Sequence, residues 1–574
     1  MTWFSESRPW RSGLWSLERR DDEFADISYR DRLVLRSVRA VVRDRNWDTA
    51  RLVVDRVRDS GATLTLYVRS EGLGSSFRGV VRVEARGTRL LVIADLESTD
   101  EFTTNRTGIV VLHPPRLAGE PLHVRHADGT VEATSFPRAI SPHQPVVDIA
   151  ALSWRYAGVD VATYFEGDVF EMEDQRNWSD ASYKTYSRPL ALPFPYDIAP
   201  GERVRQSVWI DVREVDDTRP DSEPDLIRLE IGGPVFELAV GASTAPDPAP
   251  APSSLRPPAV LVELDLRTPN WRAALTRAAV SGARLDVRVI ASADAPFDDL
   301  ASALAGVAVK PGIARIGVFE ADLQVTDAAV LAAMRRALDA ADLRLSIIGG
   351  SRAHFTELNR EQESVPRDID GVAFSTTPLF HSLGTEQLVE SVAMQRSIAL
   401  QAVELSDGLP VHVGPVTLRP RFNDAATTPQ PLPTRGDLAA GYGAEFTGAS
   451  DPRQSAEELA AWTLASAAAL AVPGVASLAF FEEWGERGIR TSAGEPYPVA
   501  SAIEALADLC ASGGRMLWGA SPDGLVWAIG ARTDEGDVAL VANLDRTTRH
   551  VTVTTDDAET TASIPAFGWL RHEL

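Results

Sequence analysis

The sequence predicts an α/β protein with a large all-β part: a (β/α)8 barrel preceded by an antiparallel β-sandwich and followed by a short β segment. Short strand-like runs fill the chain up to residue 244, and strand-like and helix-like segments alternate after residue 258. A proline-rich stretch separates these two patterns. At 574 residues the chain is long enough for two or three domains, each with its own hydrophobic core.

The division of the chain follows from these patterns. We expect a β-sandwich domain over residues 1–244, a proline-rich linker over 245–258, a catalytic barrel over 259–520 and a C-terminal β segment over 521–574. Proline stands at every second position from Pro246 to Pro252. This spacing disfavours helix and ladder hydrogen bonds and favours an extended spacer.

The segments before the linker are rich in β-branched residues, and their apolar and polar side chains alternate. A period of two predicts half-buried antiparallel strands, and the turn residues between the segments indicate a large sandwich. The clearest segments are LVLRSVRAVVRD, TLTLYVRS, GVVRVEARG, RLLVIADL, TGIVVLH, VRQSVWIDVREV and LIRLEIGG.

The segments after the linker predict the barrel, because strand and helix patterns repeat in the number that a (β/α)8 fold requires. Helical patterns such as DAAVLAAMRRALDAA separate about seven strand-like runs, and an eighth strand is expected around Arg515 to Trp518. The seven runs are AVLVELDLR, RLDVRVIAS, ARIGVFEA, LRLSIIGG, GVAFSTTP, LPVHVGPVTLRP and VASLAFFEEW. From Gly524 onward only strands are expected, and we predict that they pack on the barrel or complete the sandwich, which would bring the chain ends together.

Composition excludes several classes of function. The formal net charge is −24, so nucleic acids and anionic lipid surfaces would be repelled, and a small molecule is the expected partner. Cys510 is the single cysteine, which excludes an internal disulfide and a thiolate metal cluster. The start of the chain has no apolar leader pattern, and the apolar stretch Ala460 to Val472 is too short to span a bilayer. We expect a cytoplasmic protein without a membrane partner, and the sequence leaves its oligomeric state open.

Two glutamates are the candidate catalytic residues, because active sites of such barrels lie at the carboxyl ends of the strands. Glu357 comes after the fourth predicted strand, and Glu482 ends the seventh. Two carboxylates across the barrel mouth suit acid/base hydrolysis of an acetal or ester, in which one donates a proton while the other attacks or activates water. We predict Glu482 as base or nucleophile and Glu357 as the opposing acid. Each residue taken alone also fits an ordinary salt-bridge role.

Polar and aromatic side chains near the same strand ends are candidates for binding substrate. The barrel supplies Arg352, His354, Asn359, His381, Arg421, Glu483 and Trp484, and the polar segment 170–190 supplies Asn177, Trp178 and Lys184. Such a dense polar segment fits either a ligand contact or an interface that joins the sandwich to the barrel.

A metal site and a nucleotide cofactor are both disfavoured. His354, His381 and His412 lie near the ends of consecutive predicted strands, which raises the possibility of a three-histidine metal site, but His412 falls within its strand. No glycine-rich phosphate loop is present. We therefore expect no metal and no cofactor, and we assign His381 to a substrate hydrogen bond.

Five segments resemble the D-apionate lactonase family, bacterial sugar-acid enzymes that open D-apionolactone to D-apionate. They are TTNRTGIVVLHP, GDVFEMEDQRNWSDASYKTYSRPLALPFPY, HFTELNR, VGPVTLRPRFN and AFFEEWGERG, and together they touch both halves of the chain. The resemblance implies hydrolysis of a carbohydrate lactone without an organic cofactor, and it favours Glu357 and Glu482 as the acidic positions. The chain departs from the family at Glu483 and Trp484, where small polar residues are expected.

Two alternatives stand beside the lactonase. Paired carboxylates on strands four and seven with a flanking sandwich also resemble clan-A-like (β/α)8 glycoside hydrolases, in which Glu357 would be the acid/base and Glu482 the nucleophile. A non-catalytic carbohydrate-binding protein is the alternative from another class, and it would bind a sugar without forming a product.

Overall fold

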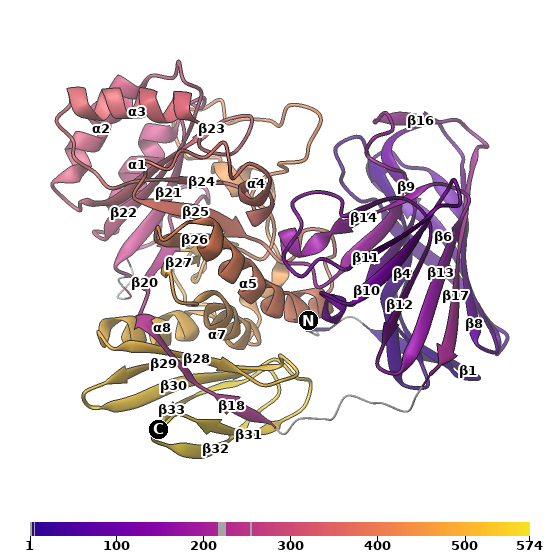
Figure 1. Ribbon diagram of the computed structural model, residues 1–574. Helices are drawn as coiled ribbons and strands as arrows, with labels where there is room; N and C mark the ends of the chain where they lie inside the picture. The colour runs from indigo at the N-terminus through magenta and orange to yellow at the C-terminus, as the bar shows by residue number, and fades with distance from the viewer. Residues whose placement is uncertain (1–2, 5, 216–224, 253–254, 256) are drawn as a thin grey trace.

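The structure is a computed structural model that describes residues 3–4, 6–215, 225–252, 255 and 257–574. An N-terminal β-sandwich stands beside an eight-stranded parallel barrel, and a smaller C-terminal β domain packs against the end of the barrel (Figure 1). The predicted combination of sandwich and barrel is confirmed. Within the described part of the chain, no helix combines the length and hydropathy of a membrane-spanning segment.

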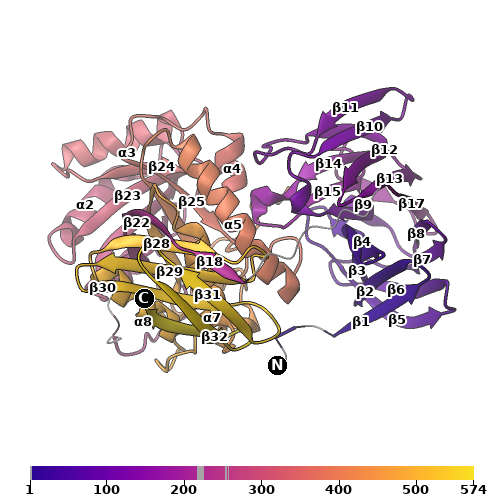
Figure 2. The same cartoon turned by 60° about the horizontal axis from the view of Figure 1, so that its bottom comes forward.

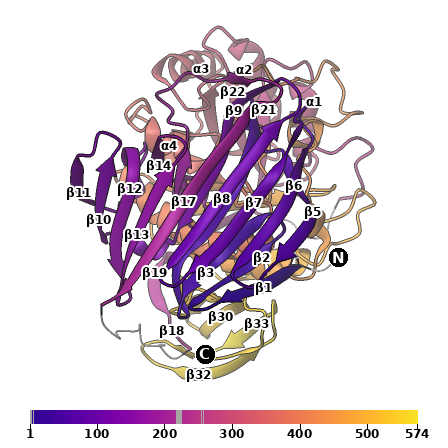
Figure 3. The same ribbon diagram turned by 90° about the vertical axis from the view of Figure 1, so that its right-hand side faces the viewer.

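The sandwich consists of two antiparallel layers that are joined through the pairing of β12 with β14. Figure 3 looks onto the layer that faces away from the barrel. In order across the sheet, this outer layer contains β11 (Val131–Ser135), β10 (Pro121–His126), β12 (Val146–Tyr156), β13 (Val159–Glu166), β17 (Arg203–Glu214), β8 (Arg89–Ser98), β7 (Phe77–Arg86), β6 (Thr63–Glu71) and β5 (Arg51–Asp59). The inner layer contains β1 (Ser7–Ser12), β2 (Trp15–Arg20), β3 (Glu23–Tyr29), β4 (Arg32–Asp44), β9 (Phe102–His113), β15 (Tyr183–Ser187) and β14 (Phe170–Asp174), and β16 (Tyr196–Ile198) pairs with the start of β9.

The sandwich core forms where the alternating apolar residues of the two layers meet. In β6, Leu64, Leu66 and Val68 are buried while the residues between them are partly exposed, which is the expected period of two. The middle of β9 departs from this pattern, because it is buried on both faces. One face of β9 contacts the sandwich core, and the other lies on the side of the sandwich that is turned toward the barrel (Figure 1).

The barrel closes through eight parallel strands whose interior positions are almost all buried. Its strands are β20 (Glu237–Gly241), β21 (Ala259–Asp265), β22 (Arg284–Ala291), β23 (Ile313–Glu320), β24 (Ile347–Gly350), β25 (Gly371–Thr376), β26 (Val411–Val416) and β27 (Val475–Glu482). Its helices are α1 (Trp271–Ala279), α2 (Phe297–Ala308), α3 (Ala328–Ala340), α4 (Phe355–Arg360), α5 (Thr385–Leu405), α6 (Gly443–Phe446), α7 (Leu459–Leu470) and α8 (Ala500–Ala511).

The first and last predicted barrel strands require correction. The barrel begins with β20, before the proline-rich segment, and β20 pairs with both β21 and β27. The predicted eighth strand around Arg515 to Trp518 is β28 (Arg515–Ala520) of the C-terminal domain. The proline-rich segment therefore connects two barrel strands and does not separate two domains. Because β20 is the first barrel strand, the number of every later barrel strand is higher by one than predicted. Glu357 therefore follows the fifth strand, and Glu482 ends the eighth.

The C-terminal domain contains two small sheets that strands from before the barrel complete (Figure 2). One sheet has the order β19 (Glu230–Pro234), β28, β29 (Val526–Thr533), β30 (Gly536–Asn543) and β33 (Trp569–Glu573), and the other has β18 (Leu226–Arg228), β31 (Arg549–Thr554) and β32 (Glu559–Ile564). The domain packs on α7 through its five-stranded sheet. This helix is buried on every side because it lies between the barrel and that sheet. The C-terminal strands were predicted either to pack on the barrel or to complete the sandwich, and the position on the barrel is confirmed. Residues near the two ends of the chain are in contact, because the Phe4 and Phe567 ring centroids are 5.2 Å apart.

Two buried histidines make the fold sensitive to acid. His113 shares a hydrogen bond with Thr185 Oγ1 at 2.8 Å and His412 one with Ser477 Oγ at 2.8 Å, and burial lowers the pKa of each ring to about 3. An unfolded histidine takes up a proton near pH 6.5, so their contribution to stability is complete above that pH and is lost as the pH falls toward 3.

We therefore expect each histidine to cost about 2–3 kcal/mol of unfolding free energy between pH 7 and pH 4.5. Urea unfolding at the two pH values measures this difference. The difference should shrink in His412→Gln and stay unchanged in the exposed control His123→Gln. Equal acid sensitivity in both variants would contradict the assignment.

Candidate active site

Two neighbouring cavities open where the carboxyl ends of the barrel strands meet the sandwich. The mouth cavity, about 550 Å³, lies over the barrel and is lined mainly by barrel residues. The interdomain cavity, about 880 Å³, lies between the barrel and the inner layer of the sandwich. The segment Phe422 to Asp424, in the loop between β26 and α6, lines both cavities and forms the wall between them.

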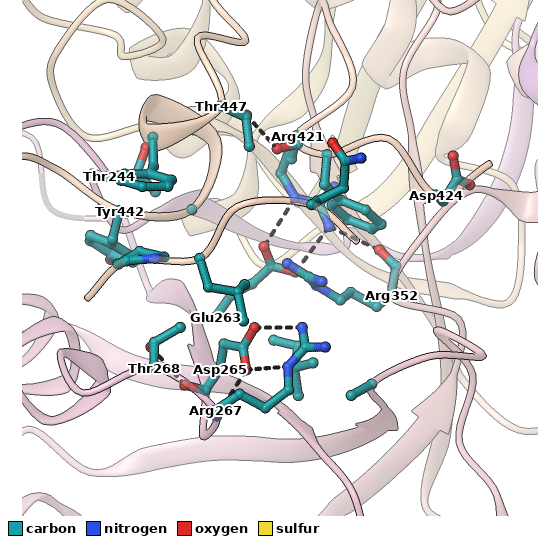
Figure 4. A pocket seen from close by; sticks show the side chains of 18 of the residues that line it. Thr244, Glu263, Asp265, Arg267, Thr268, Arg352, Arg421, Asp424, Tyr442 and Thr447 are labelled. Atoms are coloured by element: carbon teal, nitrogen blue, oxygen red, sulfur yellow. Dashed lines mark hydrogen bonds and ion pairs between the residues drawn. The ribbon is translucent and has the colours of Figure 1, made fainter. Parts of the chain in front are cut away.

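A triad of charges occupies the mouth cavity (Figure 4). Arg352 Nε donates to Glu263 Oε1 at 3.0 Å, and Arg421 donates to both oxygens of the same carboxylate at 3.1 and 2.9 Å. Although burial opposes ionisation, the two guanidiniums hold the pKa of Glu263 well below its usual range. The predicted substrate residues Arg352 and Arg421 therefore lie together, but their charges are already engaged by Glu263.

Glu482 also lies in the mouth cavity, where its carboxylate is fully bonded. It accepts hydrogen bonds from the Thr244 backbone N–H at 2.8 Å and from Arg487 Nε at 3.0 Å. The structure does not bring Glu482 and Glu357 to one cavity, because Glu357 lines the interdomain cavity. The two carboxylates do not face each other over one substrate position as the sequence analysis expected.

The interdomain cavity collects four further candidates. Its lining includes Glu357, His381, Trp178 and Lys184, all of which were predicted site residues. The lining residues that were not predicted from the sequence include Arg43, Arg106, Glu173, Arg360, Phe380, Arg419 and Asp424.

Glu357 and Asp424 form a buried carboxyl pair. Glu357 lies in the first turn of α4, which His354 precedes, and Asp424 is 3.4 Å from His354 Nδ1. Burial and the Asp424 charge raise the pKa of Glu357 well above its usual range. Burial also opposes ionisation of Asp424, but the hydrogen bond with His354 lowers its pKa. These opposite shifts favour the protonated form of Glu357 and the charged form of Asp424, and such a pair can exchange a proton with a bound substrate.

Cations from the sandwich line the same cavity. Lys184 of β15 pairs with Glu173 of β14, and the Lys184 ammonium lowers the pKa of Glu173 to about 2 although burial opposes this. Arg106 of β9 has no such partner among the residues that the structure describes. Its Nη1 donates to the Asn105 carbonyl, while Nε and Nη2 are buried and make no hydrogen bond within that part of the chain. Its guanidinium lies 5.1 Å from the Trp47 ring centroid. An unpaired buried cation in a cavity is suited to bind a carboxylate or a developing oxyanion.

Replacing Arg106 by Gln should therefore weaken ligand binding and spare the fold. We expect KM for substrate or the inhibition constant of a carboxylate product to rise about 10- to 100-fold, since a charge-assisted hydrogen bond is worth about 1.5–3 kcal/mol. The unfolding free energy of the ligand-free protein should not fall, because an uncompensated buried charge is removed. Steady-state kinetics and urea unfolding measure the two effects. A less stable variant with unchanged KM would contradict this role.

An aromatic wall and a neutral pair complete the cavity. The Trp178 and Phe380 rings are stacked at 6.0 Å between centroids, and His381 meets Trp178 edge-on at 5.2 Å. His381 Nδ1 is 2.8 Å from Asp180 Oδ2. Burial lowers the pKa of His381 well below its usual value and raises that of Asp180 to about 8, so both are neutral near pH 7. A stacked apolar wall beside neutral hydrogen-bonding groups is typical of sugar-sized ligand sites.

Two predicted residues join the domains behind the cavity wall. Asn359 Nδ2 donates to Asn177 Oδ1 at 2.9 Å and to the Ile140 carbonyl at 3.0 Å. Asn177 Nδ2 in turn donates to the Ser141 carbonyl at 2.6 Å. The polar segment 170–190 thus takes part in the domain interface through Asn177, which is one of its two predicted roles, and the other role, a ligand contact, stays a prediction for Trp178 and Lys184, which line the cavity.

Other predicted residues lie outside both cavities. Glu483 is half-buried, and desolvation raises its pKa to about 7, while the Trp484 ring centroid lies 5.3 Å from the Arg277 guanidinium. The three-histidine site is not formed: His412 is bonded to Ser477 within the barrel, away from His354 and His381.

The barrel and the sandwich place a carboxyl pair, an unpaired cation and an aromatic wall around one cavity, a composition that suits a carbohydrate-processing hydrolase. The family models agree: "D-apionate lactonase, N-terminal domain" matches residues 2–215, and "D-apionate lactonase, TIM barrel domain" matches residues 238–511. A D-apionate lactonase from Brucella anthropi is 30% identical over an alignment of 561 positions, and the match covers 89% of each chain. The chain belongs to the D-apionate lactonase family.

Two solved structures are similar over about three fifths of the chain. A GH30 endoxylanase from Clostridium papyrosolvens is 10% identical with a TM-score of 0.39, and the match covers 60% of this chain and 98% of that one. SrfJ from Salmonella typhimurium is 11% identical with a TM-score of 0.37, and the match covers 63% and 95%. At these TM-scores the likenesses say nothing about the reaction that this chain catalyses.

Proposed function

We propose that this enzyme opens a sugar lactone to the corresponding hydroxy acid and that the reaction takes place in the interdomain cavity. The observation that carries the proposal is the composition of the cavity wall. It combines the buried carboxyl groups of Glu357 and Asp424, of which Glu357 has a raised pKa, with the unpaired guanidinium of Arg106. The membership in the D-apionate lactonase family supports D-apionolactone as the first substrate to test.

Lactone opening requires both a group that transfers protons and a cation that stabilises negative charge. Water adds to the lactone carbonyl carbon, the bond between this carbon and the ring oxygen breaks, and the ring oxygen leaves as a hydroxyl that takes up a proton. The carboxyl pair removes the proton from the attacking water and can return one to the ring oxygen. Arg106 stabilises the negative charge that develops on the carbonyl oxygen and then on the carboxylate product.

Membership in an enzyme family disfavours the non-catalytic alternative. The glycosidase alternative required carboxylates on barrel strands four and seven, but Glu357 follows the fifth strand, Glu482 ends the eighth, and they line different cavities. No other observation at the site favours cleavage of a glycosidic bond.

A pH-stat assay on the purified full-length protein tests the proposal. D-Apionolactone and other five-membered aldonolactones should be opened with the release of one proton per turnover, and aryl glycosides should not be cleaved. Turnover of an aryl glycoside without turnover of any lactone would overturn the proposal.

A further inference from the structure

Three side chains beside the interdomain cavity form a cluster that the reaction described above leaves partly unexplained. His354 precedes α4, Glu357 lies in its first turn, and Asp424 comes from the loop between β26 and α6. One ligand atom from each residue lies within 4.8 Å of the others. The side chains of His354 and Asp424 are almost completely buried, with 6% and 5% of their surface exposed.

Each residue of this cluster also has a buried atom without a partner. His354 Nε2, Glu357 Oε2 and Asp424 Oδ1 make no hydrogen bond to any described residue. Buried polar atoms are nearly always bonded, and three unbonded ones in a single cluster indicate that something outside the chain completes their bonding. Nearby cations do not fill this role: Arg360 donates to the Pro142 carbonyl at 2.8 Å and lies over the Trp178 ring.

We propose that His354, Glu357 and Asp424 bind one divalent transition-metal ion, of the class of Zn²⁺ or Mn²⁺. One imidazole nitrogen and two carboxylate oxygens suit such ions, whereas Mg²⁺ and Ca²⁺ prefer oxygen ligands alone. Two atoms that are each bonded at about 2.1 Å to one ion can be at most about 4.2 Å apart. The observed 4.8 Å limit therefore requires only small side-chain movements.

Three protein ligands leave positions open for water and for a carbonyl oxygen, which is the arrangement of a catalytic metal site. This role rests on the proposed function, and in the metal-bound form both carboxylates are ionised, so that the ion takes the place of a proton on the pair. A bound divalent ion lowers the pKa of its water to about 7 and polarises a carbonyl, and both effects favour lactone opening. His381 stays outside the site, because its Nδ1 is 2.8 Å from Asp180 Oδ2 and it faces the aromatic wall.

Metal binding to the tag-free, full-length protein tests the inference directly. The protein is stripped with a chelator, supplied with Zn²⁺ or Mn²⁺ and desalted, and bound metal is counted by mass spectrometry while titration calorimetry gives the affinity. We expect one ion per chain and at least 100-fold weaker binding in His354→Gln and in Asp424→Asn. The matched controls His123→Gln and Glu361→Gln are exposed, and they should bind as the unchanged protein does.

The outcomes separate this inference from the proposed function. Binding of clearly less than one ion per chain, or equal metal affinity in all four variants, would overturn the proposed metal site. Circular dichroism identifies a variant that fails to fold, and Asp424→Ser then replaces it. Full lactone turnover by the stripped protein would also overturn the inference and would leave the lactonase intact. One tightly bound ion without turnover of any lactone would support the site and remove the proposed function.

Discussion

Replacing Glu357 by Gln is expected to lower kcat for lactone opening by about 10²- to 10⁴-fold, the usual loss when a group that transfers a proton is removed. Glutamine keeps the shape of the side chain but can neither take up a proton nor carry the charge of a metal ligand. Because burial and Asp424 already disfavour the charged form of Glu357, the fold should tolerate the neutral amide. Initial rates in the pH-stat and the urea midpoint measure both expectations.

Glu482→Gln is the matched comparison, because Glu482 is the acidic candidate of the neighbouring mouth cavity. Its carboxylate already accepts bonds from Thr244 and Arg487, so we expect a loss of stability with kcat lowered by less than about tenfold. If Glu482→Gln abolishes turnover while Glu357→Gln retains it, the reaction takes place in the mouth cavity and the assignment of the active site is wrong.

Replacing Glu263 by Gln should produce the largest loss of stability at the barrel mouth. Glu263 neutralises Arg352 and Arg421 together, and without it two buried guanidiniums lie side by side without a counter-charge. Breaking a buried ion pair costs about 3–5 kcal/mol, and we expect about 3 kcal/mol because the Glu263 side chain keeps 18% of its surface in solvent. Urea unfolding measures the loss.

Asp265→Asn is the control on the same strand, two residues further along. Asp265 also pairs with an arginine, Arg267, at 2.8 Å, but this arginine keeps 35% of its side chain exposed. An ion pair of this kind contributes about 0–1 kcal/mol. A similar loss of stability in both variants would mean that burial does not determine the importance of the Glu263 cluster.

The fold was predictable from sequence wherever local pattern determines structure. Seven barrel strands are short apolar runs between helices, and the alternation in segments such as β6 identifies the sandwich. β20 could not be found in this way, because it has five residues and its partners β21 and β27 follow it in the chain. Pairing between distant segments leaves no local signal, so the proline-rich segment was interpreted as a domain boundary although it connects two barrel strands.

The candidate site was partly predictable for a related reason. Residues that directly follow strands, such as Glu357 and His381, were identified because strand ends of a barrel meet at one face. Asp424 lies in a long loop without a strand pattern, and Arg106 lies within β9, where it reads as an ordinary strand residue. The signal that was available for Arg106 is the polar run TTNRTG, in which a buried strand contains several hydrogen-bonding side chains.

The two short strands that precede the barrel also set an order for assembly during synthesis. β18 and β19 leave the ribosome early, but their sheet partners β28 and β31 are made about 280 residues or more later. At a translation rate of about 5–20 residues per second, the edges of β18 and β19 stay unpaired for tens of seconds while the whole barrel is synthesised. The smaller β domain can therefore close only after the barrel has been synthesised, and a ribosome that stalls within the last sheet would release a chain with two unpaired, aggregation-prone edges.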